Sequence, residues 1–344
     1  MNDWLLTHLV CPRDHGALTL QDDHLICQEN HRFPVVQGVP VMLLADEEAT
    51  LWVATRSLER ASDQKGGGDD PFFTDTLGLT EEQRLEVRQR MSRVEEEPID
   101  PVVSCLVAAT SGYLYRDVCG KLRTYPIPDL RLPASDGTFL DIGCNWGRWC
   151  IAAARKGYRV VGIDPSLGAV LAAQRITKEL GLASTTSFVV GDARFLPFAP
   201  ASFDAAFSYS VLQHLSKPNA VKALQEVARV LGPAGVSLIQ MPNAFGIRSF
   251  YHQLKRKFRE PRGFEVRYWT PGELVMAFED AIGPSEFSVD GYFGLGIQAN
   301  DAKLLPMKQR AVIYSSEALR RVAAFVPPMK RVADSLYVKS KRKQ

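Results

Sequence analysis

The sequence lacks any apolar run long enough to cross a membrane. A spanning helix needs about 20 consecutive apolar residues, and no stretch of the 344 residues approaches that length. The first ten residues also lack the basic start and the long apolar stretch of a signal peptide. We therefore expect a cytoplasmic protein without a transmembrane segment.

Cysteine and net charge are also scarce. Six cysteines spread over this length do not suit a disulfide framework and fit reduced thiols or a metal site better. The formal net charge of +2 is too small to identify nucleic acid as the partner. The chain has no internal repeat, and its 46% apolar and 23% charged residues are typical of a soluble globular protein. Its length favours two domains or one domain with large appendages.

The composition divides the chain into three regions. Residues 1–46 contain short apolar pairs and turns, which predict a compact β-rich module. Residues 47–132 carry acidic clusters and polar helical stretches, which predict a helical spacer or linker. From residue 133 to residue 344, short apolar runs alternate with helical segments, as a doubly wound parallel sheet requires.

The strands of the third region can be placed individually. We expect strands at 139–142, 159–164, 188–190, 203–209 and 236–241, with two later ones at 287–292 and 335–339. Thr270-Pro-Gly-Glu273 predicts a helix start, with threonine as the cap, proline in the first turn and glutamate at the capping-box position. The expected fold class is α/β, a Rossmann-like seven-stranded sheet with a small β-rich N-terminal module.

Three aspartates mark the ends of three successive strands: Asp141, Asp164 and Asp192. The loop that begins at Asp141 runs to Gly147 between a strand and a helix, where a ligand can approach backbone N–H groups. A dinucleotide pyrophosphate would face the Asp141 carboxylate, and two like charges about 4 Å apart cost up to ~4 kcal/mol at an effective dielectric constant of 20. S-adenosylmethionine has no phosphate and carries an ammonium and a sulfonium, so an acidic wall suits it.

Five motifs carry a family resemblance: LDIGCNWG (140–147), VVGIDPS (160–166), VGDARFLPF (190–198), FDAAFSYSVLQHL (203–215) and EVARVLGPAGV (226–236). They resemble the class I S-adenosylmethionine-dependent methyltransferase superfamily. The resemblance implies cofactor contacts by the methionine-lining residues Asp141, Gly143 and Gly147, by Asp164 at the ribose, by Asp192 and Ala193 at the adenine, and by a closing segment that starts at Ser208. Many relatives have a third glycine where this chain has Asn145. Asparagine tolerates unusual backbone angles and can still hydrogen-bond, so we expect cofactor binding with altered loop contacts.

His214 is the first candidate for a general base. Methyl transfer needs a base only when the acceptor is protonated, since much of the rate can come from holding the acceptor near the methyl group. His214 follows the fourth strand, which faces the cofactor rim in this fold. A purely structural histidine is the alternative, and Tyr209, Tyr268 and His252 are weaker candidates.

A segment at about 246–268 alternates basic and aromatic residues directly after the fifth strand. Substrate loops lie at this edge of open α/β sheets. We therefore predict a lid that captures an acceptor with an anionic group and an apolar or ring-bearing body. A solvated helix face is the alternative.

The N-terminal module contains candidate metal ligands. Cys11, Cys27 and His31 fit a structural zinc site, and Asp14 stands where a second cysteine is expected, with His15 as an alternative. Through LLTHLVCP (5–12), LIC (25–27) and FPVVQGVPVML (33–43), the module resembles the small zinc-ribbon-like activator of tRNA and release-factor methyltransferases. The sequence leaves open whether the module binds one structural zinc or contains no metal.

Three functions remain. The first is methyl transfer to a small-molecule or biosynthetic-intermediate acceptor such as a sugar, a lipid-linked precursor or another metabolite. The second is methylation of tRNA or rRNA, and the third is a non-enzymatic cofactor-binding scaffold. After the fourth strand the chain has Ser208-Tyr-Ser210 and no Asn-Pro-Pro-Tyr-type motif, and it contains no dedicated RNA-binding module. These features favour a small-molecule acceptor.

Overall fold

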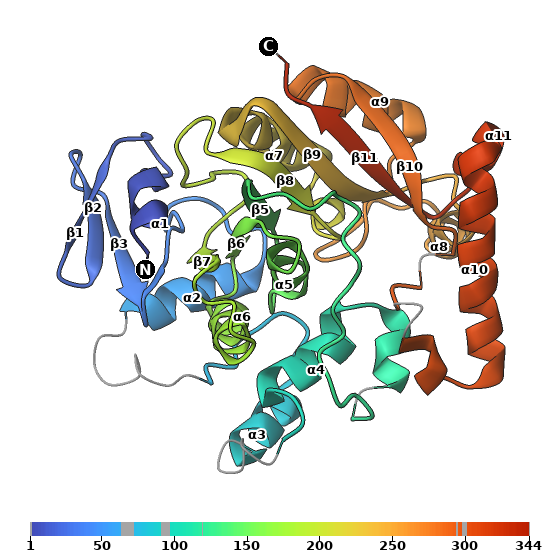
Figure 1. Cartoon of the computed structure of the whole chain (residues 1–344), viewed down its shortest axis with the longest axis horizontal. Helices are drawn as coiled ribbons and strands as arrows, with labels where there is room; N and C mark the ends of the chain where they lie inside the picture. Colours follow the sequence, from blue (N-terminus) through green and yellow to red (C-terminus); the bar gives the residue numbers. More distant parts are fainter. Residues whose placement is uncertain are drawn as a thin grey trace.

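The computed structural model describes residues 2–62, 72–90, 97–118, 120–293, 295–297 and 301–343. A seven-stranded sheet in the order β10-β11-β9-β8-β5-β6-β7 forms the centre of the molecule (Figure 1). Its strands are β5 (Thr138–Ile142), β6 (Arg159–Asp164), β7 (Thr186–Val190), β8 (Phe203–Ser208), β9 (Leu231–Pro242), β10 (Ser285–Gly291) and β11 (Ser335–Lys341). The strands from β5 to β9 pair in parallel, whereas β11 is antiparallel to both β9 and β10. The predicted α/β fold class is confirmed.

Strand positions follow the predicted apolar runs, with one marked difference. Strand β9 begins at Leu231, five residues before the predicted start at 236. Leu231 pairs with Phe203 and is fully buried. The strand therefore includes the glycine-containing irregularity, where the sequence suggested a break between the preceding helix and the strand.

Side-chain caps mark the starts of three helices of this domain. α5 (Arg148–Ala154), α6 (Leu167–Glu179) and α7 (Lys217–Val230) follow β5, β6 and β8. The Ser166 and Ser216 side chains cap α6 and α7. Thr270 and Glu273 form the predicted capping box at the start of α9 (Pro271–Ala281).

The N-terminal module contains the predicted β-rich part, a four-stranded antiparallel sheet, preceded by a short helix that the sequence analysis did not predict. It consists of α1 (Asp3–His8), β1 (Leu18–Gln21), β2 (His24–Cys27), β3 (Arg32–Val36) and β4 (Val39–Pro40). Leu5 and Leu9 share one apolar core with Leu140 and Val161 of the central sheet. The Met42 N–H donates to the Val190 carbonyl over 2.7 Å, so the module continues directly onto the β7 edge.

The region 47–132 packs closely on the central domain. It contains α2 (Trp52–Ser62), α3 (Glu81–Arg90), α4 (Pro101–Thr110) and the 3₁₀ helix η2 (Tyr113–Asp117). The Ser57 hydroxyl on α2 accepts from the Leu167 N–H at 2.9 Å and donates to the Pro165 carbonyl at 2.8 Å. Buried residues of α4 share a core with Trp146 and Ile151, so this region does more than connect two domains. The domain boundaries at 46 and 132 stay predictions.

Two further helices lie at the end of the molecule opposite the N-terminal sheet: α8 (Ile247–Lys255) and α10 (Met307–Phe325) (Figure 1). The remaining elements are η3 (Leu212–His214), η4 (Asp301–Leu304) and α11 (Pro327–Lys330). Within the described ranges, no helix has the length and apolarity needed to span a bilayer.

Candidate active site

The loop between β5 and α5 has the backbone of a ligand-binding turn. Gly143, Asn145 and Gly147 have φ angles of 75°, 49° and 82°. An added Cβ at Gly143 would lie 2.2 Å from Cγ2 of Val211, so only glycine fits this position. Asn145 has the left-handed backbone for which asparagine is suited, and its N–H donates to Asp164 Oδ2 over 3.0 Å.

Asp141 and Asp164 are buried beside this loop. Asp141 is 1% exposed and accepts a hydrogen bond from the Cys150 thiol at 3.2 Å. Burial raises the pKa of Asp141 to about 7, against the lowering effect of the Cys150 thiol. Burial raises the pKa of Asp164 to about 6, against the effect of the backbone N–H groups of Ser166 and Asn145. A nearby cation would therefore stabilise the ionised form of both carboxyls.

The other predicted cofactor residues lie on the neighbouring strand ends. Asp192 follows β7, accepts three hydrogen bonds from the Arg194 side chain and caps the Arg194 N–H. Ala193 packs against the apolar core. The Ser208 hydroxyl is buried and donates to the Ile142 carbonyl at 2.9 Å, which joins β8 to β5. The cofactor roles of Asp192, Ala193 and Ser208 stay predictions.

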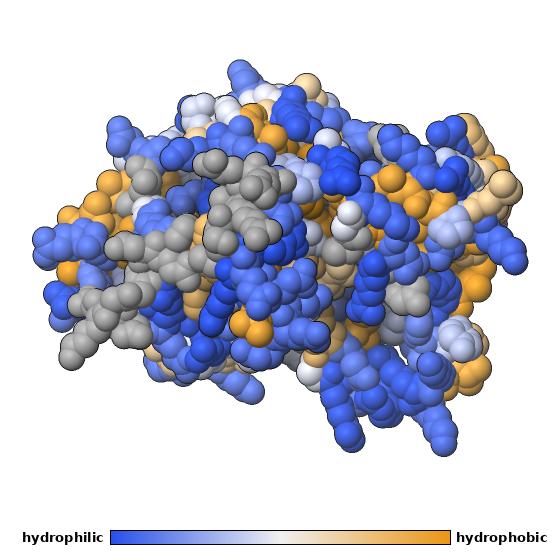
Figure 2. All heavy atoms as spheres, turned by 90° about the horizontal axis from the view of Figure 1, so that it is seen from below, coloured by the Kyte–Doolittle hydropathy of each residue, from blue (hydrophilic) through white to orange (hydrophobic). Residues whose placement is uncertain are grey.

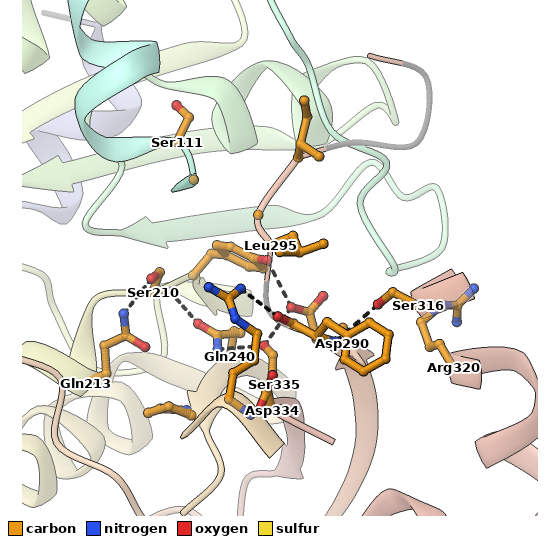
Figure 3. Close-up of a pocket in the computed structure, with 18 of the residues that line it drawn as sticks. Ser111, Ser210, Gln213, Gln240, Asp290, Leu295, Ser316, Arg320, Asp334 and Ser335 are labelled. Carbon is orange, nitrogen blue, oxygen red and sulfur yellow. Dashed lines mark hydrogen bonds between the residues drawn. The ribbon is translucent and has the colours of Figure 1, made fainter. Parts of the chain in front are cut away.

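A cavity of about 620 Å³ lies at the carboxyl edge of β8, β9 and β10. Side chains on its floor form a chain of hydrogen bonds (Figure 3). Gln213 donates to Ser210 at 2.6 Å, the Ser210 N–H donates to Gln240 at 2.8 Å, and Gln240 donates to Ser335 at 2.8 Å. Ser335 then donates to Asp290 at 2.7 Å. The floor is therefore polar and held in one arrangement.

Charged groups of both signs surround this floor. Arg131, Arg148, Arg248 and Arg320 line the cavity together with Asp290, Asp334 and Glu317. Asp334 is 5% exposed, and its Oδ1 accepts the Arg248 and Ser249 N–H groups. Its buried Oδ2 has no hydrogen-bond partner among the residues that the structure describes. The cavity can therefore offer both donors and acceptors to a polar ligand.

The cavity reaches the glycine loop through the segment after α4. The Arg148 guanidinium on α5 is buried and donates to the Ser111 carbonyl at 3.1 Å. The Ser111 hydroxyl accepts from the Trp146 indole at 3.1 Å, and Thr110 donates to the Asn145 side chain at 3.3 Å. Ser111, Thr110 and Arg148 all line the cavity. The predicted spacer thus supplies part of the site.

His214 does not line this cavity. Its ring stacks on Phe264, with ring centroids 3.6 Å apart, and its Nδ1 lies 2.8 Å from the Phe264 carbonyl. Its Nε2 lies 3.2 Å from the Gln213 amide nitrogen, so a neutral ring donating from Nδ1 fits both partners. Burial lowers the pKa of His214 to about 4. Tyr209, Tyr268 and His252, the weaker sequence candidates, all line the cavity.

The basic segment 246–268 contributes fewer cationic side chains to the cavity than its composition suggests. Arg248 and Tyr268 line it, as do Ser249, His252 and Val266. Arg259 instead forms a bidentate ion pair with Glu265, and this contact lowers the pKa of Glu265 to about 2. Arg256 donates to the Val266 carbonyl at 2.9 Å. Two of the predicted capturing arginines therefore hold the segment together.

Cys11, Asp14, Cys27 and His31 meet in the N-terminal module. One ligand atom from each lies within 4.8 Å of the others. His31 Nδ1 is 3.5 Å from Cys11 Sγ, 3.3 Å from Cys27 Sγ and 2.9 Å from Asp14 Oδ2. Zinc bonds of about 2.0–2.3 Å in tetrahedral geometry put neighbouring ligand atoms roughly 3.3–3.8 Å apart, so the four residues fit zinc with small adjustments. The exposed His15 lies outside this group.

The sequence did not single out several cavity residues: Arg131, Arg148, Gln240, Asp290, Arg320 and Asp334. They come from the loop before β5, from α5, β9, β10 and α10, and from the residue before β11. Gln240 and Asp290, near the ends of two predicted strands, had a local signal, because the carboxyl ends of strands carry ligand contacts in open α/β sheets.

Residues 139–235 match the family described as methyltransferase domain. Norajmaline N-methyltransferase of Rauvolfia serpentina is 36% identical over 101 residues, which cover 29% of this chain and 34% of that protein. O-methyltransferase resE of Aspergillus sclerotiorum is 36% identical over 105 residues, which cover 30% of this chain and 39% of that protein. The chain thus spans less than half the length of these relatives.

Solved structures with similar folds include the complex between the Haloferax volcanii Trm112 methyltransferase activator and a methyltransferase. It is 21% identical with a TM-score of 0.43, covering 62% of this chain and 85% of that chain. Geranyl diphosphate C-methyltransferase from Streptomyces coelicolor A3(2) is 16% identical with a TM-score of 0.41, covering 62% of this chain and 72% of that chain. Residues 139–235 thus match a methyltransferase domain, and the strand order and glycine loop around them are similar to those of class I S-adenosylmethionine-dependent methyltransferases.

Proposed function

We propose that the protein transfers the methyl group of S-adenosylmethionine to a small polar acceptor held in the cavity at the carboxyl edge of β8, β9 and β10. The observation that carries this proposal is the cavity itself, whose fixed polar floor adjoins the glycine loop through Ser111 and Arg148. Ligands of open α/β sheets bind at this edge.

The cofactor fits the residues around the loop. When bound, S-adenosylmethionine supplies the electrophilic methyl group. Asp141 and Asp164 would face its cationic and ribose parts together with Gly143, Asn145 and Gly147, while Asp192, Ala193 and Ser208 would face the adenine side. The buried carboxylates support a cationic ligand here, because each is held in low dielectric without a neutralising lysine or arginine hydrogen bond among the described contacts.

The cavity also offers groups that could accept a proton from the acceptor. Burial and neighbouring arginines lower the pKa of His252, so its ring is neutral at physiological pH. Asp290 and Asp334 present carboxyl oxygens to the same space. His214 remains a predicted base, and its contacts with Phe264 and Gln213 favour a positioning role for it.

Cofactor binding should strengthen as pH rises from about 5 to about 7. Asp141 and Asp164 have pKa values raised to about 7 and about 6. A bound ammonium favours the ionised form of Asp141 and ribose hydroxyl donors favour that of Asp164, so binding releases protons over this range. We expect affinity for S-adenosylhomocysteine to rise by up to about tenfold per pH unit for each carboxyl that loses its proton, and to level off above pH 7. Calorimetry in two buffers of different ionisation enthalpy measures the proton release directly. An affinity that stays flat from pH 5 to 8 contradicts it.

The acceptor is tested by turnover of cofactor with fractionated cell extract. We expect a small-molecule fraction, either polar metabolites or extracted lipids, to support formation of S-adenosylhomocysteine, and Arg248→Met to raise KM for that acceptor by about 10- to 100-fold through loss of a charged hydrogen bond. Arg262→Gln, which removes an exposed cation of the same segment that does not line the cavity, is the matched control. Turnover supported by the RNA fraction and abolished by ribonuclease would favour the RNA alternative instead.

A further inference from the structure

Helix α8 differs from the usual surface helix in which of its faces is exposed. A surface helix normally buries its apolar stripe and exposes its polar face. On α8 the apolar residues Ile247, Phe250 and Leu254 are 54%, 50% and 55% exposed. The polar residues Arg248, Ser249 and His252 line the cavity. The polar face is used by the cavity, and the apolar face is left outside.

Helix α10 repeats this arrangement on another wall of the same cavity. Ser316, Glu317 and Arg320 line the cavity. Met307, Tyr314, Val322 and Phe325 are exposed, with Met307 at 84% and Phe325 at 87%. Their spacing follows one helical face, because i, i+7, i+15 and i+18 lie within one stripe at 3.6 residues per turn.

The two segments that contain these helices carry most of the exposed large apolar side chains. Of the eighteen large apolar side chains exposed within the described ranges, fourteen lie in 245–264 or 307–332. Apolar residues are exposed along the right-hand end of the molecule in Figure 2, the end that α10 forms in Figure 1. An exposed apolar concentration of this kind marks an interaction surface.

Basic side chains accompany these apolar faces. Exposed cations near them include Lys255, Lys257, Lys308, Arg321 and Arg331. The same stretches contain few acidic residues: Glu260 and Glu317, of which Glu317 pairs with Arg320 and Arg321. The surface is therefore apolar and net positive, the combination by which amphipathic helices bind anionic lipid surfaces.

We propose that the outer faces of α8 and α10 dock on an anionic lipid bilayer, and that the acceptor is an amphiphile whose polar head group enters the cavity from that bilayer. This inference rests on the proposed methyl transfer for the identity of the acceptor, but docking itself does not depend on it. The two helices present apolar side chains to the lipid and polar side chains to the head group. One pair of helices thus joins the membrane to the site.

Other occupants suit the surface less well. In a two-fold dimer the same patch contacts itself, which would bring the basic residues of both copies together. RNA would use the cations but would leave exposed aliphatic residues such as Met307 and Val322 without a role. A bilayer with anionic head groups satisfies both the apolar and the basic groups.

Sedimentation of the full chain with lipid vesicles tests docking. We expect binding to phosphatidylcholine vesicles that contain phosphatidylglycerol, weak binding to phosphatidylcholine alone, and a loss of binding as salt increases. Phe250→Ser combined with Leu254→Ser, and separately Phe325→Ser, should each lower the vesicle-bound fraction by about tenfold. Leu20→Ser and Met276→Ser, at exposed apolar positions outside the two segments, are the matched controls and should bind like the unmodified chain.

Calorimetry with S-adenosylhomocysteine on the same variants separates the two proposals. Retained cofactor-product binding shows that a variant is folded, so a loss of vesicle binding then supports docking. Absence of vesicle binding by the unmodified chain, while it binds S-adenosylhomocysteine, overturns docking and leaves the methyltransferase proposal standing. A concentration-dependent dimer that Phe250→Ser with Leu254→Ser abolishes, or ribonuclease-sensitive binding of RNA by these helices, also overturns it.

Discussion

Replacing Asp164 by alanine is expected to weaken binding of S-adenosylhomocysteine by at least about 100-fold. Each charge-assisted hydrogen bond to a ribose hydroxyl contributes ~1.5–3 kcal/mol, so the loss of two of them corresponds to a factor of about 10²–10⁴ in affinity. The same carboxylate also accepts the N–H groups of Asn145 and Ser166, which hold the glycine loop and the start of α6. Calorimetry at pH 8, above the pKa of about 6, measures the effect with the carboxylate ionised.

Asp164→Asn is the matched comparison. It keeps an oxygen acceptor of the same shape and removes the charge, so we expect an intermediate affinity. Thermal denaturation of both variants without ligand separates a binding effect from loss of the fold. A folded Asp164→Ala protein with unchanged affinity, or tight binding of NAD in place of the adenosyl ligand, would contradict the cofactor assignment.

The parts of the fold that the sequence predicts best have local physical causes. Thr270, Pro271 and Glu273 determine a helix start among themselves, and the structure has this capping box. The sequence alone predicts that the aspartates at the ends of β5, β6 and β7 lie close together, because parallel strands share one carboxyl edge. Asn145 has the left-handed backbone that its residue type tolerates.

The cavity at the carboxyl edge of β8, β9 and β10 could not be predicted in this way, because its residues come together only when the chain folds. Arg131 and Asp290 are far apart in the sequence, and they come together when β10 joins the sheet beside β11. The antiparallel β11 brings its first residue, Ser335, to the edge where the parallel strands end. Its place near a strand end is the one local signal of Asp290, and this signal does not distinguish it from other aspartates near strand ends.

The sequence also did not show which face of α8 is exposed. Its spacing indicates an amphipathic helix, and the usual rule would bury Phe250 and Leu254 and expose the basic residues. The structure instead exposes Phe250 and Leu254 and places Arg248 against the polar cavity beneath α8. Arg256 and Arg259 likewise read as ligand-capturing cations, but they hold the Val266 carbonyl and the Glu265 carboxylate. A pattern of residue types gives a helix its two faces but does not say which face the fold will cover.

Replacing Cys27 by serine is expected to abolish metal binding in the N-terminal module and to lower the stability of the whole chain. Protein purified without added metal should contain close to one zinc per chain, and the Cys27→Ser variant close to none. Binding of a structural zinc is coupled to folding, with apparent free energies of about 10–16 kcal/mol in small zinc peptides, so losing one of four ligands should remove a large part of it. Elemental analysis and thermal denaturation with and without a chelator measure the two effects.

The expected loss extends beyond the module because the two cores are joined. Cys11, Cys27 and Leu5 pack in the same apolar cluster as Leu140 and Val161 of the central sheet, so unfolding of the module would expose the β7 edge as well. His15→Ala is the matched control: His15 neighbours Asp14 in the sequence but lies outside the four-residue group, and its loss should leave the zinc content unchanged. A cooperatively folded protein that contains no metal and whose melting temperature is unaffected by chelator would instead favour the metal-free module, held together by the hydrogen bonds among Cys27, His31 and Asp14.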